Sequence, residues 1–464
     1  MLNEAAIATL GEGLVGELVR PGDDHYDEAR AVWNGLINKR PALVARCART
    51  ADVIAAVTFA RDQGLLLSVR GGGHSVAGHG TNDGGLVIDL SPMNKVDVNP
   101  ETRTVRVGGG AMLGDLDRAT QVHGLAVPAG VVSETGVAGL TLGGGFGWLR
   151  NKYGLTLDNL LSAEVVTADG RLLTASETEN ADLFWGLRGG GGNFGIVTTF
   201  EFQAYPLGPE VFFTFVLHHG ERAREGIRFY RDFSAKAADE ISTLAVLGQV
   251  PPDAEIFPEA IHGLPFVGYV GLYAGPADEG ERAMQALRDF GQPLVDLSGR
   301  MTYVEAQQMY DEDYPAHELR YYWKSLNLES LSDEAIERMV ELAQSQPSPL
   351  TTTDIWHVGG AVRRVSDEAT AFHGRHVPFL FNVEANWADP ADDEGNISWA
   401  REYVEAMREF SDGSRYLNFA GFQEEGDGMM RDAFGAKYQR LASLKQKYDP
   451  TNLFRLNQNI APAG

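Results

Sequence analysis

The chain has 464 residues, of which 44% are hydrophobic. Its 64 acidic residues outnumber its 39 lysines and arginines, which gives a formal net charge of −25 at pH 7. A chain of this length predicts two or three domains with a sizeable core. Because nucleic acids and anionic membranes bind to basic surfaces, the excess of acidic residues argues against both as partners. A single cysteine, Cys47, excludes an internal disulfide and a metal site made of several thiolates.

We expect no export signal in the amino-terminal residues. Residues 1–15 include acidic residues and lack the basic segment that opens a signal peptide. No apolar run in the sequence is long enough to span a bilayer. We therefore expect a cytoplasmic location.

The first elements of the sequence predict a helix followed by a buried strand. The helix is expected over residues 50–63, with Thr50 as its N-cap and Gly64 at its end. The apolar run 65–69 predicts the strand. The further elements expected before residue 208 are a strand at 85–90, hairpins at 95–108 and 160–175, a helix at 181–187 and a strand at 194–205. This order favours an α+β unit over a regular doubly wound sheet.

The character of the sequence changes beyond about residue 208, where clusters of glycine end. Residues 332–344 and 399–410 have the spacing of amphipathic helices. Residues 352–362 and 379–387 suit strands. We expect a second domain in which helices pack on a sheet.

Three glycine clusters stand out in the first half of the chain. The first, Arg70-Gly71-Gly72-Gly73-His74-Ser75, follows the predicted strand; the others lie at 136–147 and 189–192. Glycine lets the backbone approach a ligand closely, and exposed N–H groups in such turns bind phosphate. One cluster alone is more often a tight turn. None of the clusters matches a nucleotide-binding fingerprint in its proper context: residues 71–73 lack the G-x-G-x-x-G spacing, and the sequence has no G-x-x-x-x-G-K-[ST]. A nicotinamide-binding domain is therefore disfavoured, but three clusters together indicate one long ligand.

Several motifs, in this order and spacing, resemble one enzyme family. They lie at residues 70–75, 128–130, 136–147, 152–155, 158–159, 182–185, 188–198 and 448–455. The family is the FAD-linked oxidases of the vanillyl-alcohol oxidase and p-cresol methylhydroxylase superfamily, in the berberine-bridge-enzyme-like branch, which is similar to the bacterial 6-hydroxy-D-nicotine oxidases. The resemblance is strong over residues 40–205 and 430–460 and looser between them.

The resemblance implies an α+β, two-domain FAD-binding fold of the p-cresol methylhydroxylase type. Its second domain would be an antiparallel sheet covered by helices, in contact with the substrate. We accordingly divide the chain into an FAD-binding domain at 1–207, a substrate domain at 208–419 and a carboxy-terminal segment at 420–464 that returns to the first domain.

The resemblance also implies that FAD is bound covalently, through His74 and the 8α-methyl group of the flavin. Many members of this branch carry a second link through a cysteine, but Val132 stands at that position, so we expect a single link. Thr135 is expected near the oxygen-reactive face of the ring, where its small side chain favours oxidase activity. The full set of implied cofactor-binding residues is Arg70, Gly71, Gly72, Gly73, His74, Ser75, Gly130, Val132, Thr135, Gly136, Gly139, Gly143, Gly144, Asn159, Ile196, Val197, Asn457 and Asn459.

The catalytic base does not carry over from the family. Some relatives use a glutamate after a Gly-Gly pair, but Gly359-Gly360 is followed by no acid. Others use the second tyrosine of Y-x-N-Y, which is Phe419 here. The candidates that remain are Tyr416, His357, Glu384 and Tyr310. If the strand faces that carry His357 and Glu384 look at the flavin, either side chain could take a proton.

These observations predict an FAD-dependent oxidase. Hydride would pass from a small organic substrate, an amine, an alcohol or a sugar-like molecule, to the flavin, and O2 would be reduced to H2O2. Three alternatives stay open: a dehydrogenase with another electron acceptor, a flavin-binding protein with little turnover, and a reductase with a related FAD fold that uses a nicotinamide cofactor.

Overall fold

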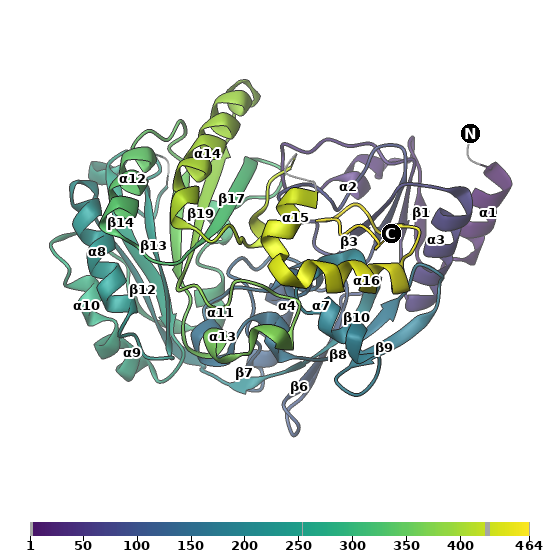
Figure 1. Cartoon of the computed structure of the whole chain (residues 1–464), viewed down its shortest axis with the longest axis horizontal. Coiled ribbons are helices and arrows are strands. Elements are labelled where there is room, and N and C mark those ends of the chain that lie inside the picture. Colours follow the sequence, from purple (N-terminus) through teal and green to yellow (C-terminus); the bar gives the residue numbers. More distant parts are fainter. Residues whose placement is uncertain (1–2, 253, 423–426, 464) are drawn as a thin grey trace.

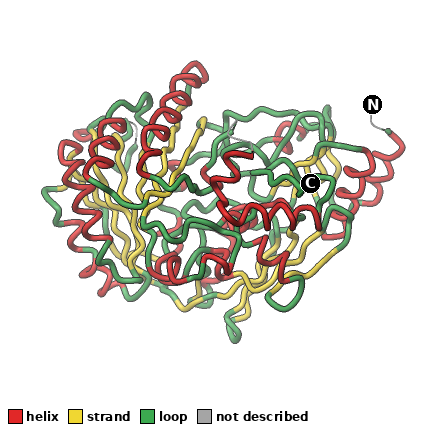
Figure 2. Tube along the Cα trace, viewed as in Figure 1, coloured by secondary structure: helices red, strands yellow, loops and turns green. Residues whose placement is uncertain are grey.

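The structure, a computed structural model, describes residues 3–252, 254–422 and 427–463. Helices and mostly antiparallel sheets form two halves, with the carboxy-terminal helices lying across the right half (Figure 1 and Figure 2). This arrangement confirms the predicted α+β fold class. None of the described helices is long and apolar enough to cross a membrane.

The first sheet has the order β1-β2-β4-β3 and carries the first glycine cluster. Its strands are β1 (Glu17–Val19), β2 (Leu43–Arg46), β3 (Leu67–Arg70) and β4 (Leu86–Asp89). Its helices are α1 (Glu4–Gly13), α2 (Tyr26–Arg30) and α3 (Thr50–Gln63). Strand β4 runs parallel to both β2 and β3, so the glycine turn after Arg70 leaves the carboxyl end of a parallel strand. Arg70 pairs in register with Asp89 and forms an ion pair with it at 2.9 Å.

The predicted helix at 50–63 is confirmed as α3. Its N-cap is Arg49 rather than Thr50, which is the first helical residue. Gly64 ends the helix with φ of +65°, a backbone conformation that glycine adopts without strain.

The second sheet is antiparallel, with the order β5-β6-β10-β8-β9, and it confirms both predicted hairpins. Its strands are β5 (Val96–Asn99), β6 (Thr104–Gly108), β8 (Leu160–Val166), β9 (Leu172–Ser176) and β10 (Ile196–Gln203). A short pair joins β7 (Leu125–Ala126) to β11 (Tyr205–Pro206). The helices of this region are α4 (Leu113–Gln121), α5 (Val137–Gly143), α6 (Arg150–Tyr153) and α7 (Ala181–Leu187).

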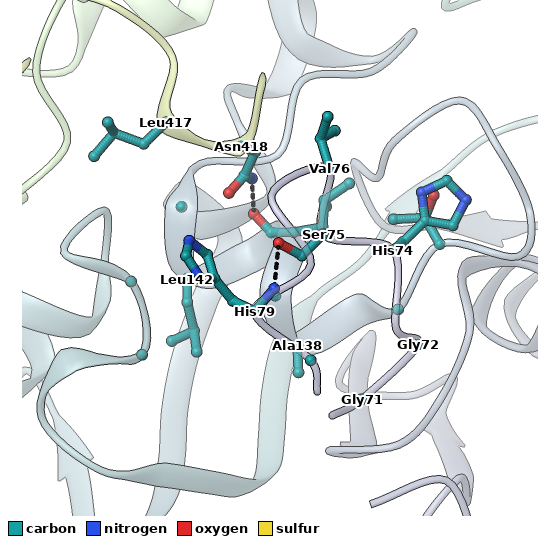
Figure 3. A pocket seen from close by; sticks show the side chains of 18 of the residues that line it. Gly71, Gly72, His74, Ser75, Val76, His79, Ala138, Leu142, Leu417 and Asn418 are labelled. Atoms are coloured by element: carbon teal, nitrogen blue, oxygen red, sulfur yellow. Dashed lines mark hydrogen bonds between the residues drawn. The ribbon is translucent and has the colours of Figure 1, made fainter. Parts of the chain in front are cut away.

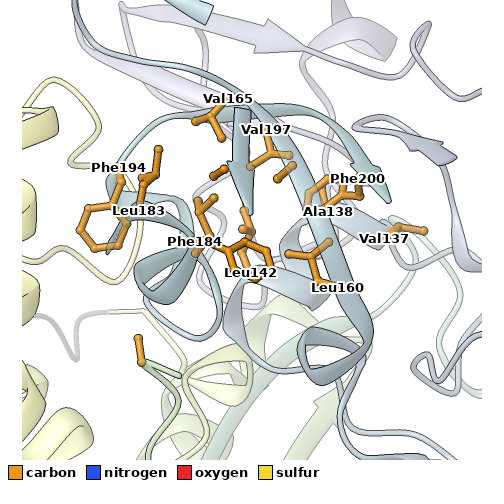
Figure 4. Close-up of a cluster of buried hydrophobic side chains, with 14 of the residues drawn as sticks. Val137, Ala138, Leu142, Leu160, Val165, Leu183, Phe184, Phe194, Val197 and Phe200 are labelled. Carbon is orange, nitrogen blue, oxygen red and sulfur yellow. The ribbon is translucent and has the colours of Figure 1, made fainter. Parts of the chain in front are cut away.

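Apolar side chains of this sheet pack against α5 and α7. Val165, Val197 and Phe200 contribute from the strands, while Leu142 of α5 and Phe184 of α7 cover them (Figure 4). This packing fixes α5, the helix that carries part of the second glycine cluster.

The third sheet is antiparallel and has eight strands among the described residues, in the order β15-β12-β14-β13-β18-β19-β17, with β16 beside β12. Its strands are β12 (Glu210–His219), β13 (Ile241–Gln249), β14 (Pro265–Tyr273), β15 (Pro293–Asp296), β16 (Gly299–Thr302), β17 (Arg320–Leu328), β18 (Thr352–His357) and β19 (Phe379–Trp387). Its helices are α8 (Ala223–Ser234), α9 (Ala277–Ala283), α10 (Gln285–Arg288), α11 (Tyr303–Gln307), α12 (Asp333–Ala343), α13 (Gly360–Arg364) and α14 (Asp393–Met407).

The two faces of this sheet have different neighbours. Ile355 and Phe381 share an apolar cluster with side chains of α8, α12 and α14, which cover the outer face (Figure 1). Trp356 and Leu380 share another cluster with Trp148 of the amino-terminal half. Because successive side chains of a strand alternate between faces, the even-numbered residues of β18 and β19 point toward the amino-terminal half.

Two predicted elements of this region have wrong bounds. The strand expected at 352–362 ends at His357 and is followed by α13. Gly360, with φ of +48°, lies in a conformation that a strand cannot continue through. The helix expected at 399–410 is α14, which begins earlier, at Asp393.

The carboxy-terminal segment lies against the amino-terminal half. Its helices are α15 (Asp427–Phe434) and α16 (Tyr438–Tyr448). Tyr448 donates to Asp182 at 3.0 Å, and Lys445 donates to the backbone carbonyl of Asn193 at 2.8 Å. Leu441 is buried in the same cluster as the second sheet. The division of the chain at 207/208 and 419/420 stays a prediction.

Candidate active site

A cavity of about 320 Å³ is lined by residues of all three glycine clusters and by side chains of the third sheet. Of the predicted cofactor-binding residues, all line the cavity except Gly144, Asn159 and Asn459. The structure thus brings together segments that lie more than a hundred residues apart in the sequence. Residues 189–192 also line it, as expected if all three clusters contact one ligand, although they were not among the implied cofactor-binding residues.

The first two glycine clusters cross each other backbone to backbone. A Cβ atom added at Gly72 would lie 2.4 Å from the backbone nitrogen of Gly136, and one added at Gly136 would lie 2.4 Å from that of Gly72. Real Cβ atoms do not approach so closely. Any side chain at either position would therefore push apart the two loops that form this side of the cavity.

His74 projects from the first glycine turn (Figure 3). Its imidazole stacks on Trp33 with 4.0 Å between ring centroids, and the other face of Trp33 stacks on Tyr321 at 3.8 Å. Its Nε2 atom is buried and has no hydrogen-bond partner. Burial lowers the pKa of His74 to about 3. The ring is therefore neutral at physiological pH and held in place by stacking, and one of its nitrogens makes no hydrogen bond.

The cavity fits a long ligand that has both polar and flat apolar parts. Gly139 and Gly192 border open space, because a Cβ added at either would meet no protein atom within 4 Å. The side-chain oxygens of Asn457 and Gln458 are buried without a partner and belong to residues that line the cavity. Together with His74 Nε2, they leave polar atoms that only a ligand or solvent can satisfy. These residues fit the FAD that the sequence predicts.

Two of the three predicted residues that do not line the cavity have structural roles. Asn159 donates to the backbone carbonyls of Tyr153 and Leu155 and accepts from the hydroxyl of Tyr205 at 2.8 Å, so its amide is fully used inside the protein. Gly144 ends α5, and its N–H donates to two carbonyls of that helix. We no longer propose either as a contact of the cofactor.

His357 also lies outside the cavity, contrary to its proposed role as a base. Its Nδ1 is 3.1 Å from the side-chain nitrogen of Asn151. Burial, and then the charge of Arg150, lower its pKa to about 3. The alternation along β18 explains the error, because Trp356 and not His357 points at the cavity.

Tyr416 does line the cavity, but its hydroxyl is already engaged. It accepts from the backbone N–H of Gly145 at 3.0 Å and from the side chain of Asn418 at 2.8 Å. Burial raises the pKa of this phenol. Tyr416 therefore joins its segment to Gly145, just beyond α5, and is unsuited to accept a proton. Asn418, which Figure 3 shows, donates to the backbone carbonyl of Leu140 in α5 at 3.1 Å.

Glu384 lines the cavity, as its candidate role requires, and Asp354 lies beside it. Glu384 accepts from the hydroxyl of Tyr314 at 2.5 Å and from the side chain of Asn382 at 2.7 Å. Burial raises the pKa of Glu384 to about 7 and that of Asp354 well above its usual range. The sequence reasoning missed Asp354, which the register of β18 with β19 would have placed on the face of Glu384.

Comparisons with known proteins agree with this geometry. Residues 41–176 match the family described as FAD binding domain, and residues 415–461 match the family described as Berberine and berberine like. The (R)-6-hydroxynicotine oxidase of Paenarthrobacter nicotinovorans is 31% identical over 470 residues, which cover 97% of each chain. The chain belongs to the berberine-bridge-enzyme-like family of FAD-linked oxidoreductases.

Solved structures of this family have the same fold. The crystal structure of 6-hydroxy-D-nicotine oxidase from Arthrobacter nicotinovorans has a TM-score of 0.86 at 30% identity and covers 97% of this chain and 98% of its own. A glucooligosaccharide oxidase from Acremonium strictum, described as carrying 6-S-cysteinyl, 8α-N1-histidyl FAD, has a TM-score of 0.87 at 25% identity and covers 99% of each chain. This berberine-bridge-enzyme-like protein is therefore an FAD-linked oxidoreductase.

Proposed function

We propose that this protein is an oxidase that holds FAD through one covalent bond to His74 and oxidises a small organic substrate, an amine, an alcohol or a sugar-like molecule. When bound, FAD would supply the acceptor for a hydride from carbon of the substrate, and O2 would be the final electron acceptor, reduced to H2O2. The observation that carries the proposal is the buried, unpartnered Nε2 of a neutral imidazole at the glycine turn of the cavity.

The chain's own groups support each part of the binding. Backbone N–H groups of residues 71–73 are suited to phosphate oxygens, and the stack of Trp33 on His74 holds the imidazole in one orientation. Val132, which lines the cavity, offers no thiol, so a second covalent bond is not expected there. Thr135 is also in the lining, and its small side chain is compatible with access of O2.

Glu384 is the base that we propose for a proton of the substrate. It is the predicted candidate that both lines the cavity and titrates near neutral pH. Tyr314 and Asn382 fix its two oxygens. The substrate would lie between this carboxyl and the glycine-rich side of the cavity.

Acid denaturation tests the covalent bond. We expect the flavin absorbance of the purified protein to stay with the acid-precipitated pellet, and to move to the supernatant in His74→Ala. His219→Ala removes an exposed histidine outside the cavity and should keep the flavin in the pellet. Release of flavin from the unmodified protein would contradict the bond to His74.

Reoxidation tests the oxidase assignment. The protein is reduced with dithionite without oxygen and then mixed with aerated buffer, while flavin absorbance and H2O2 are followed. Rapid recovery of the oxidised flavin with formation of H2O2 is expected. Slow recovery that an artificial electron acceptor accelerates would identify a dehydrogenase instead.

A further inference from the structure

Two buried carboxyl groups face the cavity from neighbouring strands. Thr352 and Asp354 of β18 pair in register with Glu384 and Asn382 of β19, so Asp354 and Glu384 are diagonal neighbours on one face. Their exposed fractions are 5% and 3%. Both oxygens of Glu384 accept hydrogen bonds, whereas Oδ1 of Asp354 is buried without a partner. Such a group is costly to bury unless something binds it.

No cation of the described chain neutralises this pair. Among the described residues that line the cavity, Arg70 is the one arginine or lysine, and it is paired with Asp89 at 2.9 Å. Arg150 lies 5.0 Å from the ring of Trp356, but its guanidinium donates to backbone carbonyls, including that of His357 at 2.9 Å. The two carboxyls therefore lack a fixed counter-ion.

The charges of these carboxyls act on each other. Burial raises both pKa values, the charge of Glu384 raises that of Asp354 further, and Asp313 raises both. The pair therefore keeps a proton near neutral pH and carries about one negative charge. A positively charged ligand would relieve the repulsion, whereas a neutral one would leave it.

The surroundings of the pair are aromatic. Tyr310, Tyr314, Trp323 and Trp356 line the same cavity. Tyr314 and Trp323 meet edge to face with 5.6 Å between centroids, and Tyr310 meets Tyr314 in the same way at 6.2 Å. Aromatic faces attract cations, and their apolar area suits the carbon atoms around a substituted nitrogen.

We infer that Asp354 and Glu384 form a binding site for a cationic amine, so that the substrate of this protein is an amine and not a sugar or a simple alcohol. This inference rests on the proposed function. The ammonium would donate to the free Oδ1 of Asp354. One N–H bond of the ammonium breaks and an O–H bond forms on a carboxylate of the pair, which frees the lone pair of nitrogen. When bound, FAD would supply the acceptor for the hydride of the adjacent C–H bond, while the nitrogen lone pair forms the C=N bond of the product.

A probe of fixed charge tests the site. Benzyltrimethylammonium has no N–H and no lone pair, so it binds without being oxidised, and 2,2-dimethylpropylbenzene is its uncharged analogue. Binding to the FAD-loaded protein is followed by tryptophan fluorescence and by flavin absorbance. We expect the cation to bind at least about tenfold more tightly than the analogue, and Asp354→Asn to weaken only the cation, by roughly ten- to a hundredfold.

Controls separate the site from the fold. Asp296→Asn removes a carboxyl that pairs with Arg288 outside the cavity and should leave both affinities unchanged. Glu384→Gln should repeat the effect of Asp354→Asn, so the test does not depend on one variant being folded. Equal affinity of cation and analogue, or an unchanged affinity of the cation in both variants, would overturn the inference.

Failure of this inference differs from failure of the proposed function. Cellobiose and benzyl alcohol are included as neutral substrates. If they form H2O2 while the cation does not bind, the protein is an oxidase without an amine site. If the cation binds as expected but reduced flavin reacts slowly with O2, the amine site stands and the oxidase assignment falls.

Discussion

One side of the cavity is rich in glycine, with residues 71–73, Gly136, Gly139, Gly143 and residues 189–192 in its lining. The other side presents carboxyl and aromatic side chains of β17, β18 and β19. The first side can hold a ligand that is the same throughout a family, because N–H groups do not change with the side chain. The second side can be altered residue by residue without moving a strand. We therefore expect the glycine side to hold the cofactor and the sheet side to select the substrate.

The glycine side should tolerate the least change. Gly72→Ala places a Cβ 2.4 Å from the backbone of Gly136, where no flexible side chain can give way. We expect a loss of about 3 kcal/mol or more in the free energy of unfolding, with little soluble, flavin-containing protein. Thermal unfolding and the ratio of flavin to protein absorbance measure both effects.

Gly139→Ala is the matched variant on the same side. Its Cβ meets no protein atom within 4 Å, and it lies in α5, where alanine favours the helix by about 1 kcal/mol. We expect a folded protein of unchanged or higher stability and a reduced flavin content, because the methyl group enters the cavity. Full flavin content in this variant would mean that α5 does not contact the cofactor.

On the sheet side, by contrast, a substitution at Asp354 should stabilise the protein. The pH dependence of the free energy of unfolding should show this gain. The folded protein raises the pKa of Asp354, so it holds a proton that the unfolded chain releases near pH 4. Stability is therefore lost as the pH rises above about 4, and Asp354→Asn removes this loss. We expect the stability of the variant relative to that of the original protein to increase between pH 4 and pH 8.

Denaturant unfolding of the FAD-loaded protein at the two pH values measures this gain. Asp89→Asn gives the contrast from the glycine side, since it leaves Arg70 buried without its partner and should cost about 3–5 kcal/mol. A variant at Asp354 that is destabilised at pH 8 would show that this carboxyl supports the fold and is not a strained binding group.

The glycine side was also the more predictable one. The turn at 70–75 follows β3, and most residues inferred from the motifs line the cavity. Residues of one short motif are close in sequence, so they also lie close together in the structure. Asn159 lies outside the lining because its side chain donates to nearby backbone carbonyls, a local contact that the sequence does not reveal.

On the sheet side the sequence did not show which face of β18 meets the cavity. Residues 352–357 carry apolar side chains on both faces, Ile355 on one and Trp356 on the other, as expected for a strand covered on both sides. Period-two patterning therefore could not decide which face meets the cavity. His357 was proposed and Asp354 was missed for this reason, and only the register of β18 with β19 places Asp354 beside Glu384.

The smallest effect is expected from the hydrogen bonds between Ser133 and Asp311, which connect the glycine side of the cavity to the sheet side. Ser133, in the loop that follows Gly130, donates to Asp311 from its backbone N–H at 2.7 Å and from its hydroxyl at 2.5 Å. Asp311 begins the turn that leads to Tyr314, the hydrogen-bond partner of Glu384. The bond thus joins a loop on the cofactor side to a residue that orients the carboxyl pair.

A double-mutant cycle of Ser133→Ala and Asp311→Asn should give a coupling energy of about 1 kcal/mol in the free energy of unfolding. Flavin content should stay complete, because neither side chain lines the cavity. Affinity for benzyltrimethylammonium should fall by a factor of a few, because Tyr314 and Glu384 lose part of their support. If flavin content fell and cation affinity did not, the loop would serve the cofactor alone, and the two sides of the cavity would be independent.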